Sequence, residues 1–369
     1  MWGEIVRNLC VSDALAVSRT SKAFWVLRPL RFVALLPRTK RAYSRLTDAR
    51  LSLFSGLVRL DLSGNETITN AGLSSLTTLT ALELRDYSEI TDAGLSRSKA
   101  LTSLDLGSNT DITGTCLSAL TKLTRLDLSF KTNITDSILS KLTTLTQLKL
   151  EFSPGITDAG LSALTALTRL DLGSNSVITN AGLSDLTALT WLGLGMNYKI
   201  TNAGLSKLTA LTHIDLSRNT KITDAGLSKL TALRWLDLCK NATITNGGLS
   251  ELTALTHLDL NRNAVITDAG LSELTTLTWL DLEVNSTISD AGLSKLTALK
   301  WLGLCDNTKI TDAGLSKLTT LTHIDLRCNH NITDVGLSAL TSLTSLDRYD
   351  NRKITDTTRS LLRGRFVCI

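Results

Sequence analysis

Tryptophan, histidine and aspartate recur in this sequence at intervals of 22 residues, and their side chains are the groups most suited to chemistry. One position of the interval is Trp or His seven times in succession, at Trp191, His213, Trp235, His257, Trp279, Trp301 and His323. Two residues later the position is mostly acidic, as at Asp215, Asp237, Asp259 and Asp281. Indole rings beside carboxylates can hold a Lys or Arg side chain through cation–π and charge contacts. The pattern therefore favours non-covalent binding of a cationic segment.

The same residues are poorly spaced for catalysis or for metal binding. His213, His257 and His323 are at least two intervals apart, which is roughly 10 Å or more if each interval adds one strand. Zinc requires ligands at about 2.0–2.1 Å. The sequence also lacks a Ser-His-Asp or Cys-His grouping that a fold would assemble, and it lacks a phosphate-binding glycine loop. We expect no catalytic residue, no metal and no cofactor, and hence no enzyme.

The interval is a repeat that occupies most of the 369 residues. Each copy contains an L-x-L alternation, which predicts a strand, followed by a segment such as "ITDAGLSEL" with helical spacing. This order resembles the leucine-rich-repeat pattern. We call each copy a rung and predict an α/β solenoid over residues 46–369. It would have about 14 rungs, a parallel sheet on its concave face and short helices on its convex face.

Two polar positions recur across the rungs and indicate structural roles. The residue after the Thr of "IT" is Asp nine times, Asn four times and Gly once. Asp and Asn share an acceptor oxygen, so we predict a helix N-cap there, and the Ala-Gly that follows should allow neighbouring segments to approach closely. Asn follows the strand in eleven of fourteen rungs, with Tyr87, Lys131 and Ser153 as exceptions. In leucine-rich repeats this amide bonds the backbone of adjacent rungs, which predicts a ladder.

Composition and charge restrict the partners and the location. Residues 1–50 hold 10 Lys/Arg and 3 Asp/Glu, a balance of +7 within a total of +5, which leaves −2 for the rest. This asymmetry does not indicate one nucleic-acid-binding surface. Glu4, Arg7 and Asp13 interrupt any apolar leader, and no stretch approaches the roughly 20 apolar residues of a membrane helix. The six cysteines follow no paired spacing. We expect an intracellular, reduced protein without nucleic-acid or membrane partners.

Residues 1–45 form a separate head with two helical apolar stretches around "VSD". One interpretation is a small helical cap over the first rung. The head also resembles an F-box, the helical module that binds the Skp1-type adaptor of cullin ubiquitin ligases, at Glu4-Ile5, Leu9, Asp13-x-Leu15 and "VSRTSKAFW". The rungs, of the form "ITDAGLSxLTxLTxLDL", resemble those of F-box/leucine-rich-repeat proteins over residues 46–369.

This resemblance implies a substrate receptor of a Skp1-cullin-F-box ubiquitin ligase, monomeric within its complex and located in the cytoplasm. If the basic run at residues 38–45 serves nuclear import, the protein would also be located in the nucleus. Otherwise the run is a solvated edge of a linker. The alternative is a non-enzymatic scaffold whose head is only a cap. The rung at 346–369 is expected to cap the other end, because Arg348 replaces a strand leucine. The residues expected to contact the adaptor are Ile5, Leu9, Leu15, Val17 and Trp25.

The Trp and His positions should face the solvent in the hollow of the solenoid, where they would bind a protein substrate that carries Lys or Arg. Two other interpretations stay open. Residues 191–219 nearly repeat at 301–329, so the alternation could be inherited from a block duplication. Stacked aromatic rings on neighbouring strands also stabilise a sheet without any ligand. The aspartates could likewise be an inherited, solvated consensus, although carboxylates stacked about 5 Å apart repel one another and attract cations.

Overall fold

The chain is seen in a computed structural model that describes residues 34–35, 46–54, 56–86, 89–131 and 133–355. It divides into two compact units, residues 1–178 and residues 179–369, which we call unit 1 and unit 2 and describe separately. The predicted head at 1–45, apart from Ala34 and Leu35, lies outside the described residues. The chain after residue 355 also lies outside them.

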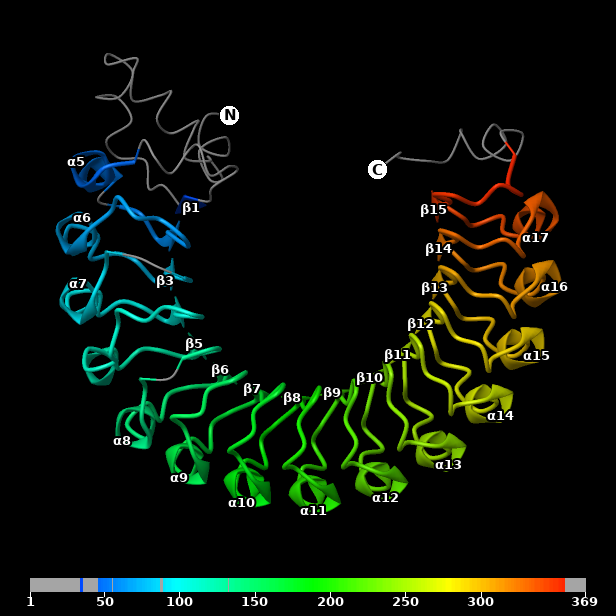
Figure 1. Ribbon diagram of the computed structural model, residues 1–369, viewed down its shortest axis with the longest axis horizontal. Coiled ribbons are helices and arrows are strands. Elements are labelled where there is room, and N and C mark those ends of the chain that lie inside the picture. The colour runs from blue at the N-terminus through cyan, green and yellow to red at the C-terminus, as the bar shows by residue number, and fades with distance from the viewer. Residues whose placement is uncertain (1–33, 36–45, 55, 87–88, 132, 356–369) are drawn as a thin grey trace, which may run out of the picture. The chain divides into compact units, whose positions relative to one another are not determined.

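Unit 1 is a stack of rungs in which strands form a parallel sheet and short helical segments lie on the other side (Figure 1). From β2 onward the strands pair in register 22 residues apart, as Leu104 does with Leu126. The strands are β1 (Ala34–Leu35), β2 (Arg59–Asp61), β3 (Ala81–Glu83), β4 (Ser103–Asp105), β5 (Arg125–Asp127), β6 (Gln147–Lys149) and β7 (Arg169–Asp171). The helical segments are α5 (Asp48–Leu51), η2 (Ser52–Phe54), α6 (Asn70–Ser74), α7 (Asp92–Leu95), η3 (Leu117–Ala119), α8 (Asp136–Leu139) and α9 (Asp158–Leu161).

Unit 2 repeats this plan with the same register, as in the pair Leu236 with Leu258. The strands are β8 (Trp191–Gly193), β9 (His213–Asp215), β10 (Trp235–Asp237), β11 (His257–Asp259), β12 (Trp279–Asp281), β13 (Trp301–Gly303), β14 (His323–Asp325) and β15 (Ser345–Asp347). The helices are α10 (Asn180–Leu183), α11 (Asn202–Leu205), α12 (Asp224–Leu227), α13 (Asn246–Leu249), α14 (Asp268–Leu271), α15 (Asp290–Leu293), α16 (Asp312–Leu315) and α17 (Asp334–Ser338). The predicted solenoid fold is confirmed.

The core of each unit lies between the strands and the helices and is almost entirely aliphatic. In the rung of β10, Leu236 and Leu238 have no exposed surface, while Asp237 between them points to the opposite face of the sheet. This alternation follows from the period of two along a strand. Ile244 and Leu249 fill the core from the return segment. The side chains before, between and after the paired leucines are therefore the ones that the strand face presents.

The asparagine ladder predicted from the repeat is present and buried. In unit 2, Asn241 donates from Nδ2 to the carbonyls of Leu216 and Asn219, each at 3.0 Å. Its Oδ1 accepts from the backbone N–H of Ile244 at 2.9 Å. One amide thus satisfies two carbonyls of the preceding rung and two N–H groups of its own turn, since Oδ1 also accepts from the N–H of Thr243. Such groups would be costly to leave unpaired in the core.

Two exceptions to the ladder lie in unit 1 and satisfy the same kind of carbonyl by other means. Lys131 is 2% exposed and donates from Nζ to the carbonyl of Ile112 at 2.7 Å and to that of Asn109. Ser153 donates from Oγ to the carbonyl of Leu128 at 2.6 Å. The ladder therefore requires a donor at this position, and Asn is the residue that most rungs use.

The predicted N-cap role of the Asp or Asn position is wrong. Helices begin at that residue, and the preceding Thr or Ser occupies the N-cap, as Thr223 does for α12. The carboxylate of Asp224 instead accepts from the next rung, from the N–H of Thr245 at 2.8 Å and from its hydroxyl at 2.6 Å. The need for an acceptor was predicted correctly. Its donor belongs to the following rung, so these side chains join successive rungs.

The glycine that follows this position makes the contact possible. A Cβ on Gly248 would lie 2.5 Å from Oδ1 of Asp224 and 2.9 Å from Cγ2 of Ile244. Neither distance is compatible with a real methyl group, so glycine leaves the space that the carboxylate of the previous rung occupies. The predicted close approach of neighbouring return segments is confirmed at this position.

A residue in the left-handed conformation follows the strand in the rungs, a feature that the sequence pattern did not predict. The residue three positions after the last residue of the strand has positive φ, for example +51° at Arg262, +52° at Val284 and +61° at Phe130. Its N–H donates to the next rung, as that of Arg262 does to the carbonyl of Glu283 at 2.9 Å. L-residues pay roughly 1–2 kcal/mol for this conformation. The bond to the next rung helps to hold the residue there.

Candidate functional site

The seven predicted Trp and His positions stand at the first residue of strands β8 to β14 in unit 2. We call them the aromatic column: Trp191, His213, Trp235, His257, Trp279, Trp301 and His323. The parallel register places Trp235 directly between His213 and His257. Residues 22 positions apart in the sequence therefore form one continuous row on the strand face.

Several rings of the aromatic column stack on a neighbouring ring. The rings of Trp279 and Trp301 have centroids 4.4 Å apart and planes inclined by 11°, and His257 stacks on Trp279 at 6.2 Å. Parallel strands lie about 4.8 Å apart, so rings on adjacent strands meet face to face. His323 is exposed and the other six members are half-buried. The expectation that the whole column faces open water is therefore corrected, because six of its seven members are half-buried and stacking covers part of several rings.

Trp301 lies over a glycine that the sequence reasoning overlooked. A Cβ on Gly303 would be 2.7 Å from Cη2 of Trp301 and 2.5 Å from Oδ1 of Asp281. The strand is "WLG" here, where most strands of unit 2 carry an acidic residue in third place. The missing side chain makes room for the indole beside the carboxylate of the neighbouring strand. The break in the acidic pattern was the available signal.

The aspartates next to the aromatic column form a second row, which we call the acidic column: Asp215, Asp237, Asp259 and Asp281. The register sets each one opposite the next. Each uses Oδ1 to accept the backbone N–H two residues later, for example from Cys239 to Asp237 at 2.7 Å and from Glu283 to Asp281 at 2.9 Å. These bonds orient the carboxylates along the strand ends.

The acidic column is electrostatically strained, as the sequence predicted. Burial, together with the charges of Asp215 and Asp259, raises the pKa of Asp237 to about 7. Burial, with Asp259 and Glu283, raises the pKa of Asp281 to about 6. Like charges in neighbouring positions disfavour the ionised form. A cation placed over this row would relieve the repulsion.

The two columns offer indole faces and carboxylates within one surface, which suits an ammonium or guanidinium group. Burial lowers the pKa of His257, which disfavours a positive charge on its imidazole. Within the described residues, no group of three His, Cys, Asp or Glu side chains is arranged to hold a metal ion.

The structure describes only some of the other residues that the sequence analysis singled out. The proposed adaptor contacts, Ile5, Leu9, Leu15, Val17 and Trp25, lie outside the described residues. The cysteines at 116, 239, 305 and 328 are free thiols. Among the helices that the structure describes, none has the length and apolar character needed to cross a bilayer.

Comparisons with known proteins agree on the architecture. The family model described as "Leucine Rich repeat" matches six segments, at residues 57–77, 141–164, 165–186, 207–230, 251–275 and 317–341. No curated protein sequence matches the chain.

Among solved structures, a leucine-rich-repeat protein of Leptospira interrogans is 19% identical, with a TM-score of 0.58, over 93% of this chain and 96% of that one. A chain of the Drosophila Toll–Spatzle complex is 17% identical with a TM-score of 0.60, over 90% of this chain and 48% of that one. An internalin of Listeria monocytogenes is 26% identical over 89% of this chain and 92% of that one, with a TM-score of 0.48. At such identities the likeness concerns the fold. The rung architecture is that of a leucine-rich-repeat solenoid, and the six family-model matches support this description.

Proposed function

We propose that the strand face of unit 2 binds a protein segment that carries Lys or Arg side chains. The observation that carries this proposal is the stacked pair Trp279 and Trp301 beside the carboxylate of Asp281. A cationic side chain over the indole face would gain a cation–π contact of about 0.5–2 kcal/mol. It would also relieve the repulsion within the acidic column. Solenoid repeats commonly use such extended faces for binding.

The outer end of the stacked pair is the preferred point of contact. Trp301 stacks on Trp279 through one face of its indole, and its other face is directed to the strand of His323, which is exposed. Covering about 100 Å² of one indole contributes roughly 2.5 kcal/mol. Two such rings together with the charge contacts would support binding in the micromolar range. A protein ligand also fits the comparison with Toll, whose solved structure is a complex with Spatzle.

The test is a titration with a fluorescein-labelled peptide of Lys, Arg and Gly, and with the same peptide after acetylation of its lysines and replacement of Arg by Gln. We expect the cationic peptide to bind and the neutral one to bind at least about tenfold more weakly. Trp301→Ala should weaken the binding of the cationic peptide by about 10–50-fold. Gly303→Ala should also weaken it, because the new methyl group displaces the ring of Trp301. Tyr198→Ala removes an aromatic ring that is also exposed in unit 2 and serves as the matched control.

Equal binding of the two peptides would refute the proposal. So would unchanged affinity in Trp301→Ala. Melting temperatures distinguish the stacking interpretation, in which the rings only stabilise the sheet. In that case Trp301→Ala would lower the melting temperature and Gly303→Ala would lower it too, while neither would affect peptide binding.

We further propose that residues 1–45 couple this binding face to a ubiquitin ligase, in the cytoplasm or nucleus, through a Skp1-type adaptor. The support is the F-box-like sequence of the head alone, since all six family-model matches lie within residues 57–341. Co-purification of the full chain with the adaptor tests the proposal. A folded, monodisperse chain that does not associate would leave the alternative, a scaffold whose head is a cap.

A further inference from the structure

The strand face of unit 1 carries a depression of about 250 Å³ that differs in character from the face of unit 2. Its lining spans β3 to β7 and includes four cations, Arg85, Arg125, Lys149 and Arg169. The carboxylates in the lining are Glu83, Asp105 and Asp127. Positions that hold Trp and His in unit 2 hold Arg125, Gln147 and Arg169 here, so this surface has its own chemistry.

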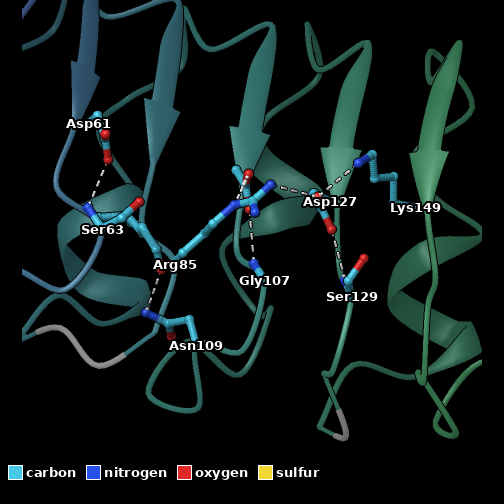
Figure 2. A network of polar contacts seen from close by, with 10 residues as sticks. Asp61, Ser63, Arg85, Gly107, Asn109, Asp127, Ser129 and Lys149 are labelled. Atoms are coloured by element: carbon cyan, nitrogen blue, oxygen red, sulfur yellow. Dashed lines mark hydrogen bonds and ion pairs between the residues drawn. The ribbon is translucent and has the colours of Figure 1, made fainter. Parts of the chain in front are cut away.

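Two cations of the depression, Arg85 and Lys149, are more exposed than the carboxylates with which they pair. Figure 2 shows the guanidinium of Arg85 reaching across to Asp127, which also faces Lys149. Arg85 bonds Asp105 at 2.5 Å and Asp127 at 3.3 Å. The side chains of Arg85 and Lys149 are 50% and 41% exposed, whereas those of Asp105 and Asp127 are 16% and 12% exposed. Solvent therefore meets the positive groups first.

An exposed pair of aromatic residues, Phe130 and Phe152, lies on the two rungs that contain Asp127 and Lys149. The rings of Phe130 and Phe152 stack with centroids 5.1 Å apart and planes inclined by 19°, and each residue is 51% exposed. They stand three residues after Asp127 and Lys149, at the left-handed position, with φ of +61° and +48°. Positive φ recurs at this position in each described rung from residue 86 to residue 350, so the backbone conformation belongs to the repeat and only the aromatic side chains are particular to these two rungs.

The copies within the chain show how unusual these rungs are. At the left-handed position the other described rungs carry residues such as Ser108, Ser174 and Arg262, and aromatic rings occur there only on these two adjacent rungs of the described chain. On the same rungs Lys149 replaces the usual aspartate, and Lys131 and Ser153 replace the ladder asparagine. Apolar rings held in water beside a cationic depression match the usual composition of a protein-binding surface, in which aromatic anchors adjoin charged groups.

We infer that this surface of unit 1 is a second binding site, for a protein segment that presents carboxylates next to an aromatic or aliphatic side chain. The apolar side chain would cover Phe130 and Phe152, and the carboxylates would pair with Arg125 and Lys149. The inference does not depend on the function proposed for unit 2. It has the opposite charge preference, so the two can fail separately.

The experiment is a selection of random dodecapeptides on phage against the full chain, with removal of phage that also bind the double variant Phe130→Ser/Phe152→Ser. Serine stands at the same position, with similar φ, at Ser108 and Ser174, so the variant should fold. The selected peptides are expected to combine Asp or Glu with an aromatic or aliphatic residue. By fluorescence polarisation, the best peptide should bind Lys149→Asp at least about tenfold more weakly than the unmodified chain. Lys240→Ser/Arg262→Ser, at the same position in unit 2, is the matched control and should bind normally.

Three results would overturn the inference. The first is that no peptide distinguishes the chain from the Phe130→Ser/Phe152→Ser variant. The second is that the distinguishing peptides are rich in Lys and Arg instead of Asp and Glu. The third is self-association of the unmodified chain that the double variant abolishes, measured by analytical ultracentrifugation, since the occupant would then be a second copy.

Discussion

Asp237→Asn tests the electrostatics of the acidic column most directly. The carboxylate has charged neighbours on both sides, Asp215 and Asp259, and its pKa is raised from 3.8 to about 7. Asparagine removes the charge but keeps the Oδ1 that accepts the N–H of Cys239 at 2.7 Å. The substitution therefore isolates the cost of the charge from the loss of a hydrogen bond.

The sign and size of the effect follow from the pKa. Between about pH 4 and pH 7 folded Asp237 keeps a proton that the unfolded chain has lost, so the stability of the unmodified protein falls as pH rises through this window. Each pH unit of difference is worth about 1.4 kcal/mol, which sets an upper limit of roughly 4 kcal/mol. Screening of a half-buried group reduces this to about 1–2 kcal/mol. Asp237→Asn should raise the free energy of unfolding by that amount at pH 8 and by almost nothing near pH 4.

Urea unfolding followed by tryptophan emission measures the gain, because Trp235 and Trp279 belong to the adjacent column. Asp325→Asn is the matched control. Asp325 also ends a strand of unit 2, but its carboxylate pairs with Arg327 at 2.7 Å, so its removal should give no gain. An equal gain at pH 4 and pH 8 for Asp237→Asn, or none at pH 8, would refute the electrostatic account. The cationic peptide should in turn bind more weakly at pH 6 than at pH 8, because protonated Asp237 no longer attracts it.

Further predictions concern the joints between rungs, and chemical unfolding measures each of them. Gly248→Ala should lower the free energy of unfolding by about 1–3 kcal/mol, because the new methyl group would lie 2.5 Å from a carboxylate oxygen. Gly247→Ala should raise it by about 0.5–1 kcal/mol, because the nearest atom to the new methyl group is 3.4 Å away and alanine forms helices better than glycine does. Val284→Gly should raise the free energy of unfolding by about 0.5–1 kcal/mol, because glycine adopts the φ of +52° at this position without strain. The same change at Val335, which is exposed on helix α17, should lower it by about as much, because glycine is a poor helix former. Burial lowers the pKa of Lys131 to about 8, so the stability of the unmodified protein should rise from pH 8 to pH 10, and Lys131→Asn should abolish that rise and gain about 1–3 kcal/mol at pH 7.

Much of the fold could be predicted because the copies share one length. A constant 22 residues from rung to rung fixes the parallel register, and the alternation of leucines fixes which side chains enter the core. The buried Asn241 was predictable because an amide that bonds adjacent rungs is hard to replace. The partner of Asp224 was not predictable. A side chain that accepts a hydrogen bond from its own helix and one that accepts from Thr245 of the next rung would both be Asp or Asn. The residue type therefore does not distinguish the two roles.

The candidate site was predicted in position and missed in geometry. The line from Trp191 to His323 follows from register alone, but the stacking of Trp279 on Trp301 depends on ring orientation, which sequence spacing does not encode. The unit 1 surface was missed because Phe130 and Phe152 read as ordinary loop residues. Their exposure results from a left-handed backbone, and the varied residues at that position in other rungs hide it.

Stacking and binding are not true alternatives for the aromatic column. Strands about 4.8 Å apart bring rings on adjacent strands into contact whether or not a ligand exists, so stacking alone gives no evidence against binding. The informative feature is where the stack ends. Trp301 leaves one indole face directed to exposed His323, and its ring packs over Gly303 beside the carboxylate of Asp281. This outer indole face next to a carboxylate is therefore the strongest structural reason to expect a ligand at this end of the column.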